Sequence, residues 1–291
     1  MSRVVDLPGS GRLIVATDMQ GHLGDFLQVA RIFEEQRRER SDTYLVLTGD
    51  LVHGPELEAH EWPEHLGGYY VGESVALLEE AAALQQRHPG HVHYLLGNHE
   101  HAHIGGPVVG KFFPDEAARL EELLGPARTR WVRDWLIGWP LVAVAPRAGL
   151  CMLHGAPHAQ IRSREDIDEI DLVALQQGGS MRLAGARNIL TALLWARAAS
   201  AERARAFLRA LGPTLQVAIH GHDVAREGFV VEDTTHLCVS SSFGCHDGDK
   251  VYVTWELDEP AISALDVARR GLRRLWPGAS PVYLDPGFRE D

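Results

Sequence analysis

Five short polar clusters in this 291-residue chain combine residue types that bind metal ions. They cover residues 18–22, 49–54, 97–100, 154–155 and 220–222, and each places a carboxylate, an amide or an imidazole near a glycine. Carboxylate, amide and imidazole ligands together suit Mn, Fe, Zn or Mg, and the lack of cysteine in the clusters argues against a structural zinc site. Glycine lets the backbone pass close to a bound ion or phosphate. The clusters therefore predict a metal centre.

Each cluster taken alone has a simpler explanation. A single histidine after a strand is usually structural, Asp18 and Asp50 are also good helix-capping residues, and Asn98 tolerates a left-handed turn. All five clusters, however, directly follow apolar stretches of the sequence. This repeated arrangement favours a shared site over five unrelated turns.

The elements that carry these clusters can be predicted from hydrophobic periodicity. Apolar runs at 13–17, 44–47 and 91–96 indicate strands, and helical spacing over 25–38 and 74–86 places a helix between successive strands, which implies parallel pairing. We expect a hairpin, a helical insertion and a β-rich end to follow; these lie at 141–153, about 158–213 and 215–255. We therefore expect the strands to form two sheets that pack face to face. In such sheets, ligands bind beyond the carboxyl ends of the strands, where the clusters lie.

Composition restricts the class of protein. Apolar residues make up 45% of the chain and charged residues 23%, as in ordinary globular proteins. The net charge of −12 disfavours binding to nucleic-acid phosphates, so no nucleic-acid partner is expected. The sequence has neither an apolar run of membrane-spanning length nor a signal peptide at its start, and its three cysteines do not form a disulfide framework. We expect a cytoplasmic protein without a membrane partner.

In order and spacing, the clusters resemble the motifs of the calcineurin-like metallophosphoesterases, in particular those of the serine/threonine phosphoprotein phosphatases. The strongest match is Leu-Leu-Gly-Asn-His-Glu at 95–100, and the segments 139–141 to 153–155 and 222–228 add further similarity. The resemblance extends over about residues 11–257. It implies an α/β fold in which two mixed sheets pack as a sandwich flanked by helices. Residues 1–257 would form one catalytic domain, and 258–291 would be a C-terminal extension.

The resemblance also implies a role for each motif residue. Asp18 and Gln20 would bind the first of two divalent metal ions, Asp50 would bridge both ions, and His99 would be the catalytic acid that protonates the leaving oxygen. The second ion would be bound by the remaining residues, which are Asn98, His154 and His222. Manganese is the metal we expect, with Fe, Zn or Mg as alternatives.

The sequence departs from the family pattern at several positions. Gln20 replaces the usual histidine with an amide oxygen, which favours Mn or Mg over Zn at the first metal. His53 and Gly54 stand where the family has an aspartate and a phosphate-binding arginine. His53 could therefore orient His99 or contact the phosphate. Candidates for a replacement cation are Arg187 and Arg197, and His220 is expected just outside the metal ligands.

The predicted activity is metal-dependent hydrolysis of phosphate monoesters, with a phosphoprotein or a small phosphate ester as substrate. The resemblance favours an enzyme like the serine/threonine phosphoprotein phosphatases. The altered phosphate-binding positions leave a nucleotidase, a dinucleoside polyphosphate hydrolase or a phosphodiesterase open. A catalytically inactive metal-binding regulatory protein is the remaining alternative.

Overall fold

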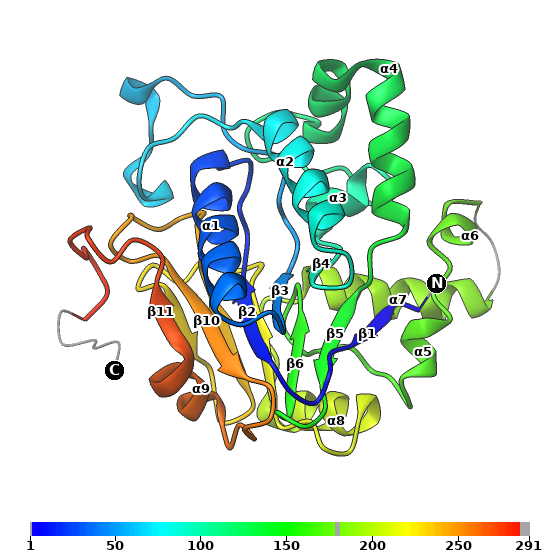
Figure 1. Ribbon diagram of the computed structural model, residues 1–291. Coiled ribbons are helices and arrows are strands. Elements are labelled where there is room, and N and C mark those ends of the chain that lie inside the picture. Colours follow the sequence, from blue (N-terminus) through cyan, green and yellow to red (C-terminus); the bar gives the residue numbers. More distant parts are fainter. Residues whose placement is uncertain (1, 178–180, 286–291) are drawn as a thin grey trace.

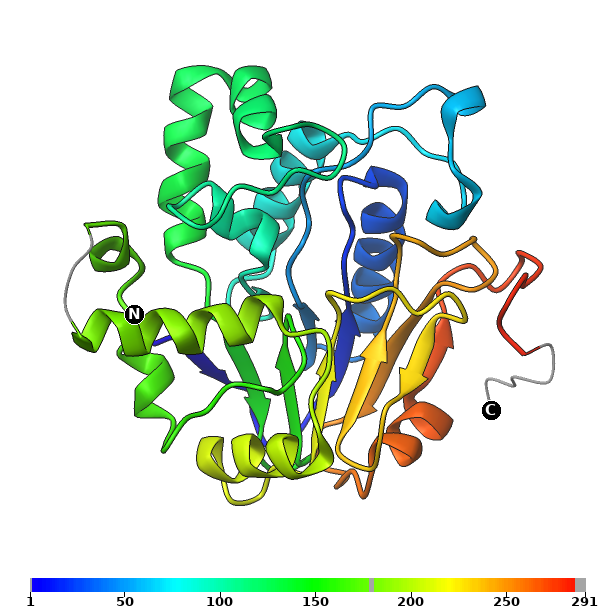
Figure 2. The same ribbon diagram turned by 180° about the vertical axis from the view of Figure 1, so that it is seen from behind.

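Two β-sheets lie face to face at the centre of the molecule, and helices cover their outer surfaces (Figures 1 and 2). The computed structural model describes residues 2–177 and 181–285. Both sheets contain parallel and antiparallel pairs, which confirms the predicted sandwich of mixed sheets.

One sheet holds the strands predicted for the first part of the chain. Its order is β11-β10-β2-β3-β4. The pairs β2–β3 and β3–β4 are parallel, whereas β10 runs antiparallel to both β2 and β11. The five strands span Leu272–Arg274, Val251–Glu256, Arg12–Ala16, Thr43–Leu47 and Val92–Tyr94, in that order.

The second sheet has the order β1-β5-β6-β7-β9-β8. The predicted hairpin is present as the antiparallel pair β5–β6, and β6, β7 and β9 are parallel to one another. The six strands span Val4–Asp6, Val142–Ala145, Leu150–Leu153, Val217–His220, His236–Val239 and Phe229–Val231, in that order.

Strand β2 shows how the core fixes the sandwich. Leu13 and Val15 pack between the two sheets, whereas Ile14 and Ala16 belong to the core beneath the helices. All four side chains have 0% exposure, because successive residues of a strand point to opposite faces and both faces of this strand are covered. A one-residue slip in register would exchange the two cores and displace the polar residues that follow the strand.

Helices α1 (Leu23–Glu39) and α2 (Ser74–Arg87) pack together over the first sheet, and α8 (Ala201–Leu211) contacts β7 of the second. Helix α7 (Met181–Trp195) crosses the same side of the molecule as α8 (Figure 2). The remaining helical segments are α3 (Asn98–Ala102), α4 (Glu116–Ile137), α5 (Glu165–Asp168), α6 (Leu172–Gln177), α9 (Ala264–Gly271) and two short 3-10 turns, Ala59–Glu61 and Glu64–Leu66.

The chain after residue 257 is integrated into the sandwich. Strand β11 pairs with β10, and helix α9 packs on β10, β9 and β8. Neither element was predicted from the sequence. The division of the chain at residue 257 into a catalytic domain and an extension stays a prediction.

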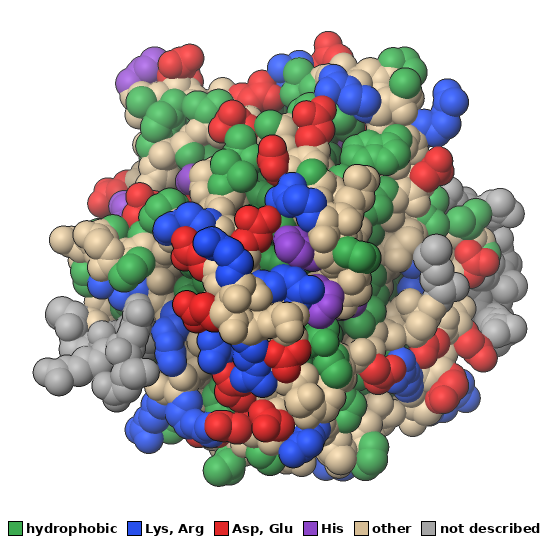
Figure 3. All heavy atoms as spheres, in the orientation of Figure 1, with side chains coloured by type: hydrophobic (Ala, Val, Ile, Leu, Met, Phe, Trp, Pro, Cys, Tyr) green, Lys and Arg blue, Asp and Glu red, His purple; other side chains and the backbone are tan. Residues whose placement is uncertain are grey.

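The molecular surface carries both signs of charge. On the face shown in Figure 3, basic and acidic side chains are interspersed and form no continuous basic area among the described residues. Within the described part of the chain, no helix is both long enough and apolar enough to cross a membrane.

Candidate metal centre

The six predicted metal ligands meet beyond the carboxyl ends of strands from both sheets. Asp18 and Gln20 follow β2, and Asp50 follows β3. The others lie at the start of α3 and beyond β6 and β7; they are Asn98, His154 and His222. All of them except His154 line one cavity of about 360 Å³, and His154 contacts the group from beneath. The structure therefore brings together the residues that the motifs selected.

The contacts of His154 show which kind of ligand the group suits. Its Nδ1 lies 2.9 Å from the carbonyl oxygen of Thr48, so this nitrogen carries the proton of the neutral ring. Its Nε2 then presents a lone pair to Asn98 Oδ1 at 2.9 Å, to His222 Nδ1 at 3.1 Å and to Asp50 Oδ1 at 3.4 Å. Carboxylate, amide and imidazole acceptors converging on one point form a site for a cation.

Gln20 supports the same conclusion at the neighbouring position. Its Nε2 donates to Asp50 Oδ2 at 3.0 Å, which leaves the amide oxygen buried and without a hydrogen-bond partner in the described structure. His222 Nε2 is likewise buried and unpartnered. Because a buried polar atom without a hydrogen-bond partner is costly, these residues fit a pair of divalent ions better than they fit an apolar interior.

Burial raises the pKa values of the two aspartates in this group and lowers those of the two histidines. Burial, together with the charge of Asp50, raises the pKa of Asp18 well above its usual value. The pKa of Asp50 is raised to about 7, again mainly by burial. Burial lowers the pKa of His154 to about 3 and that of His222 to about 2, so both rings are neutral at pH 7. A divalent ion would stabilise the carboxylates and use the neutral imidazoles as ligands.

The backbone is strained at the same residues. Among the described residues other than glycine, the positive φ angles all belong to this region: Asp18, Gln20, Asp50, His53 and His222, with values between 45° and 69°. Left-handed backbone costs such residues about 1–3 kcal/mol each and persists only where the surrounding structure imposes it. This backbone turns Asp18, Gln20, Asp50 and His222 into the cavity soon after their strands end, whereas His53 lines a separate pocket.

Glu100, the last residue of the third cluster, fixes the loop that carries Asp50. Its buried carboxylate accepts the backbone N–H groups of Asp50 and Leu51, each at 2.8 Å, and that of Gly97 at 3.1 Å. Burial raises the pKa of Glu100 to about 7, against the effect of these hydrogen bonds. Glu100 belongs to the Gly-Asn-His-Glu motif, but no role was predicted for it from the sequence.

His99 lies beside the ligand group, with Nε2 3.8 Å from Asp50 Oδ2. Its Nδ1 is 2.9 Å from Nδ1 of His53 and 3.4 Å from Oε2 of Glu116. Glu116 is buried, and burial raises its pKa to about 7. His53 thus lies against His99, which is compatible with one of the two roles suggested from the sequence, and Glu116 adds a carboxylate that was not predicted.

Three cationic side chains can be compared as partners for a phosphate. Arg197 lines the cavity and pairs with Asp223 Oδ1 at 2.9 Å. Lys111 also lines the cavity, and its Nζ lies 3.4 Å from the centre of the Phe243 ring. Arg187 instead donates to the carbonyl of Leu175 at 2.7 Å and is not among the residues that line this cavity.

Lys111 was missed by sequence reasoning, although a signal was available. The chain holds 28 basic residues, of which Lys111 and Lys250 are the two lysines. Such strong use of arginine makes a lysine unusual in this chain.

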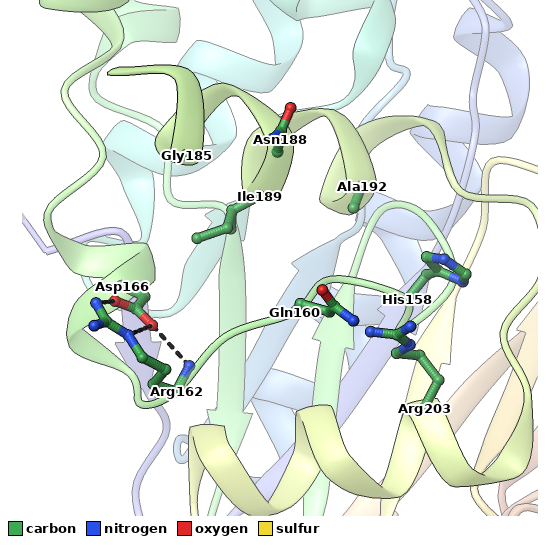
Figure 4. Close-up of a pocket in the computed structure, with 9 residues that line it drawn as sticks. All are labelled: His158, Gln160, Arg162, Asp166, Gly185, Asn188, Ile189, Ala192 and Arg203. Atoms are coloured by element: carbon green, nitrogen blue, oxygen red, sulfur yellow. Dashed lines mark hydrogen bonds and ion pairs between the residues drawn. The ribbon is translucent and has the colours of Figure 1, made fainter. Parts of the chain in front are cut away.

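A larger cavity of about 510 Å³ lies beneath α7, away from the metal ligands (Figure 4). Arg162 pairs with Asp166 there, while His158, Gln160 and Arg203 face one another at the other end. The cavity contains one carboxylate, which is already paired, and no group of converging acceptors among its described residues. Its size alone does not make it the reactive site.

Comparison with known protein families agrees with a metal centre at this position. The sequence model of the calcineurin-like phosphoesterase family matches residues 11–226. A serine/threonine phosphatase from Saccharomyces cerevisiae, described as similar to human phosphatase PP5, superimposes with a TM-score of 0.58 at 16% identity, covering 87% of this chain and 76% of that one. A cold-active protein-tyrosine phosphatase from a psychrophilic Shewanella gives a TM-score of 0.53 at 15% identity, covering 89% and 78%. No curated protein matches the sequence significantly.

The fold and the metal-binding groups define a metal-dependent phosphoester hydrolase. The chain belongs to the calcineurin-like phosphoesterase family, whose centres contain two metal ions. At their low identities, the two structural relatives establish the fold and leave the substrate open.

Gly221→Ala is expected to disrupt the metal centre. A Cβ at this position would lie 1.8 Å from Asp18 Oδ2 and 2.9 Å from Thr17 Cβ, so the Asp18 carboxylate must move. We expect metal affinity to fall by about 10- to 100-fold, the usual cost of disturbing the groups around a ligand. Metal titration of the chelator-treated protein measures this. Gly185→Ala is the control, since a Cβ there meets nothing within 4 Å; equal affinities of the two variants would contradict the prediction.

Proposed function

We propose that this enzyme hydrolyses phosphate monoesters and acts on phosphoserine and phosphothreonine in proteins. The observation that carries the proposal is the gathering of six acceptor-bearing side chains, Asp50 among them, with His99 at the edge of the group. Asp18 and Gln20 would bind one ion and Asp50 both. The second ion would be bound by Asn98, His154 and His222.

A pair of divalent ions, when bound, lowers the pKa of a coordinated water and offsets charge on the phosphoryl group. Asp50 keeps both carboxylate oxygens in place through the N–H of His99 at 3.1 Å and the amide of Gln20. His99 Nε2 faces the cavity and would protonate the leaving oxygen. His53 is within hydrogen-bond distance of the opposite ring nitrogen and Glu116 lies 3.4 Å from it, so both would help to orient His99.

Lys111 and Arg197 would replace the phosphate-binding arginine that is missing at position 54. Both line the cavity that contains the metal ligands. The contact with Phe243 holds the Lys111 ammonium at the cavity, where Asp18 and Asp50 attract it. A lysine binds phosphate as a point charge and needs no fixed bidentate geometry, so it can serve from a different direction.

The substrate class rests on the family resemblance of the motifs and on the likeness to the yeast phosphatase. Both support a phosphoprotein without excluding a small phosphate ester. Phosphate release from phosphoserine, phosphothreonine and phosphotyrosine peptides, from nucleotides and from a phosphodiester tests the proposal. We expect the highest kcat/KM with phosphoserine or phosphothreonine peptides. Faster turnover of a nucleotide or the diester would overturn this assignment, and Asp50→Asn provides the inactive control.

The role of His99 predicts a dependence on the leaving group. His99→Ala should lower kcat on an alkyl phosphate by about 10²- to 10⁴-fold, the usual contribution of a general acid, because an alkoxide leaves poorly without a proton. The loss with p-nitrophenyl phosphate should be much smaller, since p-nitrophenolate is a good leaving group. Steady-state kinetics of the variant on both substrates measure the two losses. Equal losses would argue against proton donation by His99.

Substitution of Lys111 should weaken activity, whereas substitution of Arg187 should not. Lys111→Met should raise KM or lower kcat/KM by about 10- to 100-fold, because a hydrogen bond to a charged group contributes about 1.5–3 kcal/mol. Arg187→Ala should change kcat/KM little, since its guanidinium is bound to a carbonyl outside the cavity. Kinetics on one phosphopeptide compare the variants, and Lys111→Arg tests whether charge alone suffices. A larger effect at Arg187 than at Lys111 would reverse this assignment.

A further inference from the structure

A second group of buried acceptors lies at the other side of the His220-Gly221-His222 segment. His220 is the last residue of β7, Glu232 directly follows β8, and His236 is the first residue of β9. His220 Nε2 lies 3.6 Å from Glu232 Oε2, and His236 Nε2 is in direct contact with the same oxygen. Both imidazoles are fully buried, whereas the Glu232 side chain is 21% exposed.

The proton of the His220 ring can be placed from its surroundings. Nδ1 lies 3.0 Å from the carbonyl oxygen of Gly221, which can only accept a hydrogen bond. In the neutral ring, Nδ1 therefore carries the hydrogen and Nε2 carries a lone pair. That lone pair is directed at the carboxylate of Glu232, another acceptor.

His236 is held in the same way. Its Nδ1 lies 3.2 Å from Asp233 Oδ1 and 3.1 Å from Thr235 Oγ1. The Thr235 hydroxyl donates its own hydrogen to Asp233, so its oxygen is left to accept. Nδ1 of His236 is thus the donor, and its Nε2 also presents a lone pair to Glu232.

We propose that His220 Nε2, His236 Nε2 and the Glu232 carboxylate bind one further metal ion of the zinc type. The three ligand atoms lie within 4.8 Å of one another, and within the described structure no well-aligned hydrogen bond is formed by His220 Nε2, His236 Nε2 or Glu232 Oε2. Two imidazoles and one carboxylate are an established zinc ligand set, and rings whose second nitrogen donates to a carbonyl or carboxylate are typical of metal-bound histidine. The exposed side of Glu232 leaves room for water as a fourth ligand.

Such an ion would join the β8–β9 hairpin to the end of β7. Strand β8 is the edge of its sheet, and it pairs with β9 alone among the described strands. The ion would also fix His220, two residues before His222, and the Gly221 carbonyl to which the His220 ring donates. We assign it a structural role that orients the second-metal ligand His222. The inference does not depend on the proposed phosphatase activity.

Zinc stoichiometry tests the site. The full-length protein is treated with a chelator, supplied with Zn²⁺, freed of excess metal and analysed for zinc per chain. We expect His236→Gln to contain one zinc ion fewer than the unmodified protein. His60→Gln, which changes an exposed histidine in the 3-10 turn Ala59–Glu61, should match the unmodified protein. Equal zinc contents in folded His236→Gln and unmodified protein would overturn the proposal, because protons would then be holding the cluster together.

Two further measurements keep the result interpretable. Co²⁺ in place of Zn²⁺ should give the visible absorption of a four-coordinate ion, and His236→Gln should lose it. If His236→Gln does not fold, as judged by circular dichroism, Glu232→Gln replaces it, since that side chain is partly exposed and keeps its shape. Unchanged zinc content and spectrum in Glu232→Gln would overturn the proposal. Loss of the dinuclear centre would leave this one-ion difference intact, so the two failures are distinguishable.

Discussion

The active region depends on acceptors being buried against acceptors. Around His154 Nε2, the nearest polar atoms are an amide oxygen, a carboxylate oxygen and another imidazole nitrogen. Without a cation, the two oxygens and the lone pair of His154 Nε2 repel one another in a medium that screens charge poorly. Their burial, which moves the pKa of Asp50 up and that of His154 down, is therefore a cost that the rest of the fold must sustain.

The two packed sheets offset this unfavourable free energy and hold the loops in place, so that the buried acceptors cannot move apart. Left-handed backbone turns Asp18 and Asp50 into the cavity directly after their strands. Close approaches at Gly97 and Gly221 bring neighbouring segments against these carboxylates, where any side chain would collide with them. Glu100 then holds the Asp50 loop through its backbone N–H groups. The geometry is set before a ligand arrives, which is what electrostatic catalysis requires.

The sequence predicted those parts of the structure that leave a local pattern. Several strands, such as 13–17 and 44–47, are apolar runs in the sequence, and the predicted metal ligands follow them at motif spacing. Both the strands and the ligands could therefore be predicted from the sequence. Strands β1 and β11 have three residues each and include charged residues, so no apolar run marks them in the sequence. Glu116 and Lys111 belong to a helix start and an irregular loop, and only the packing of α4 beside α3 places Glu116 against His99.

The His220-Gly221-His222 segment shows why residue type alone did not separate the two groups of acceptors. Two histidines spaced by one residue would share a face if the strand continued. Strand β7 ends at His220, however, and the left-handed backbone of His222 turns its ring towards His154. His220 remains in the sheet register and faces Glu232 from the adjacent hairpin. Gly221 must stay small between them because Asp18 occupies the space a side chain would need. One short segment thus contributes a histidine to each of two chemically similar clusters. The φ angle of its last residue directs the His222 ring towards His154, while the His220 ring faces Glu232.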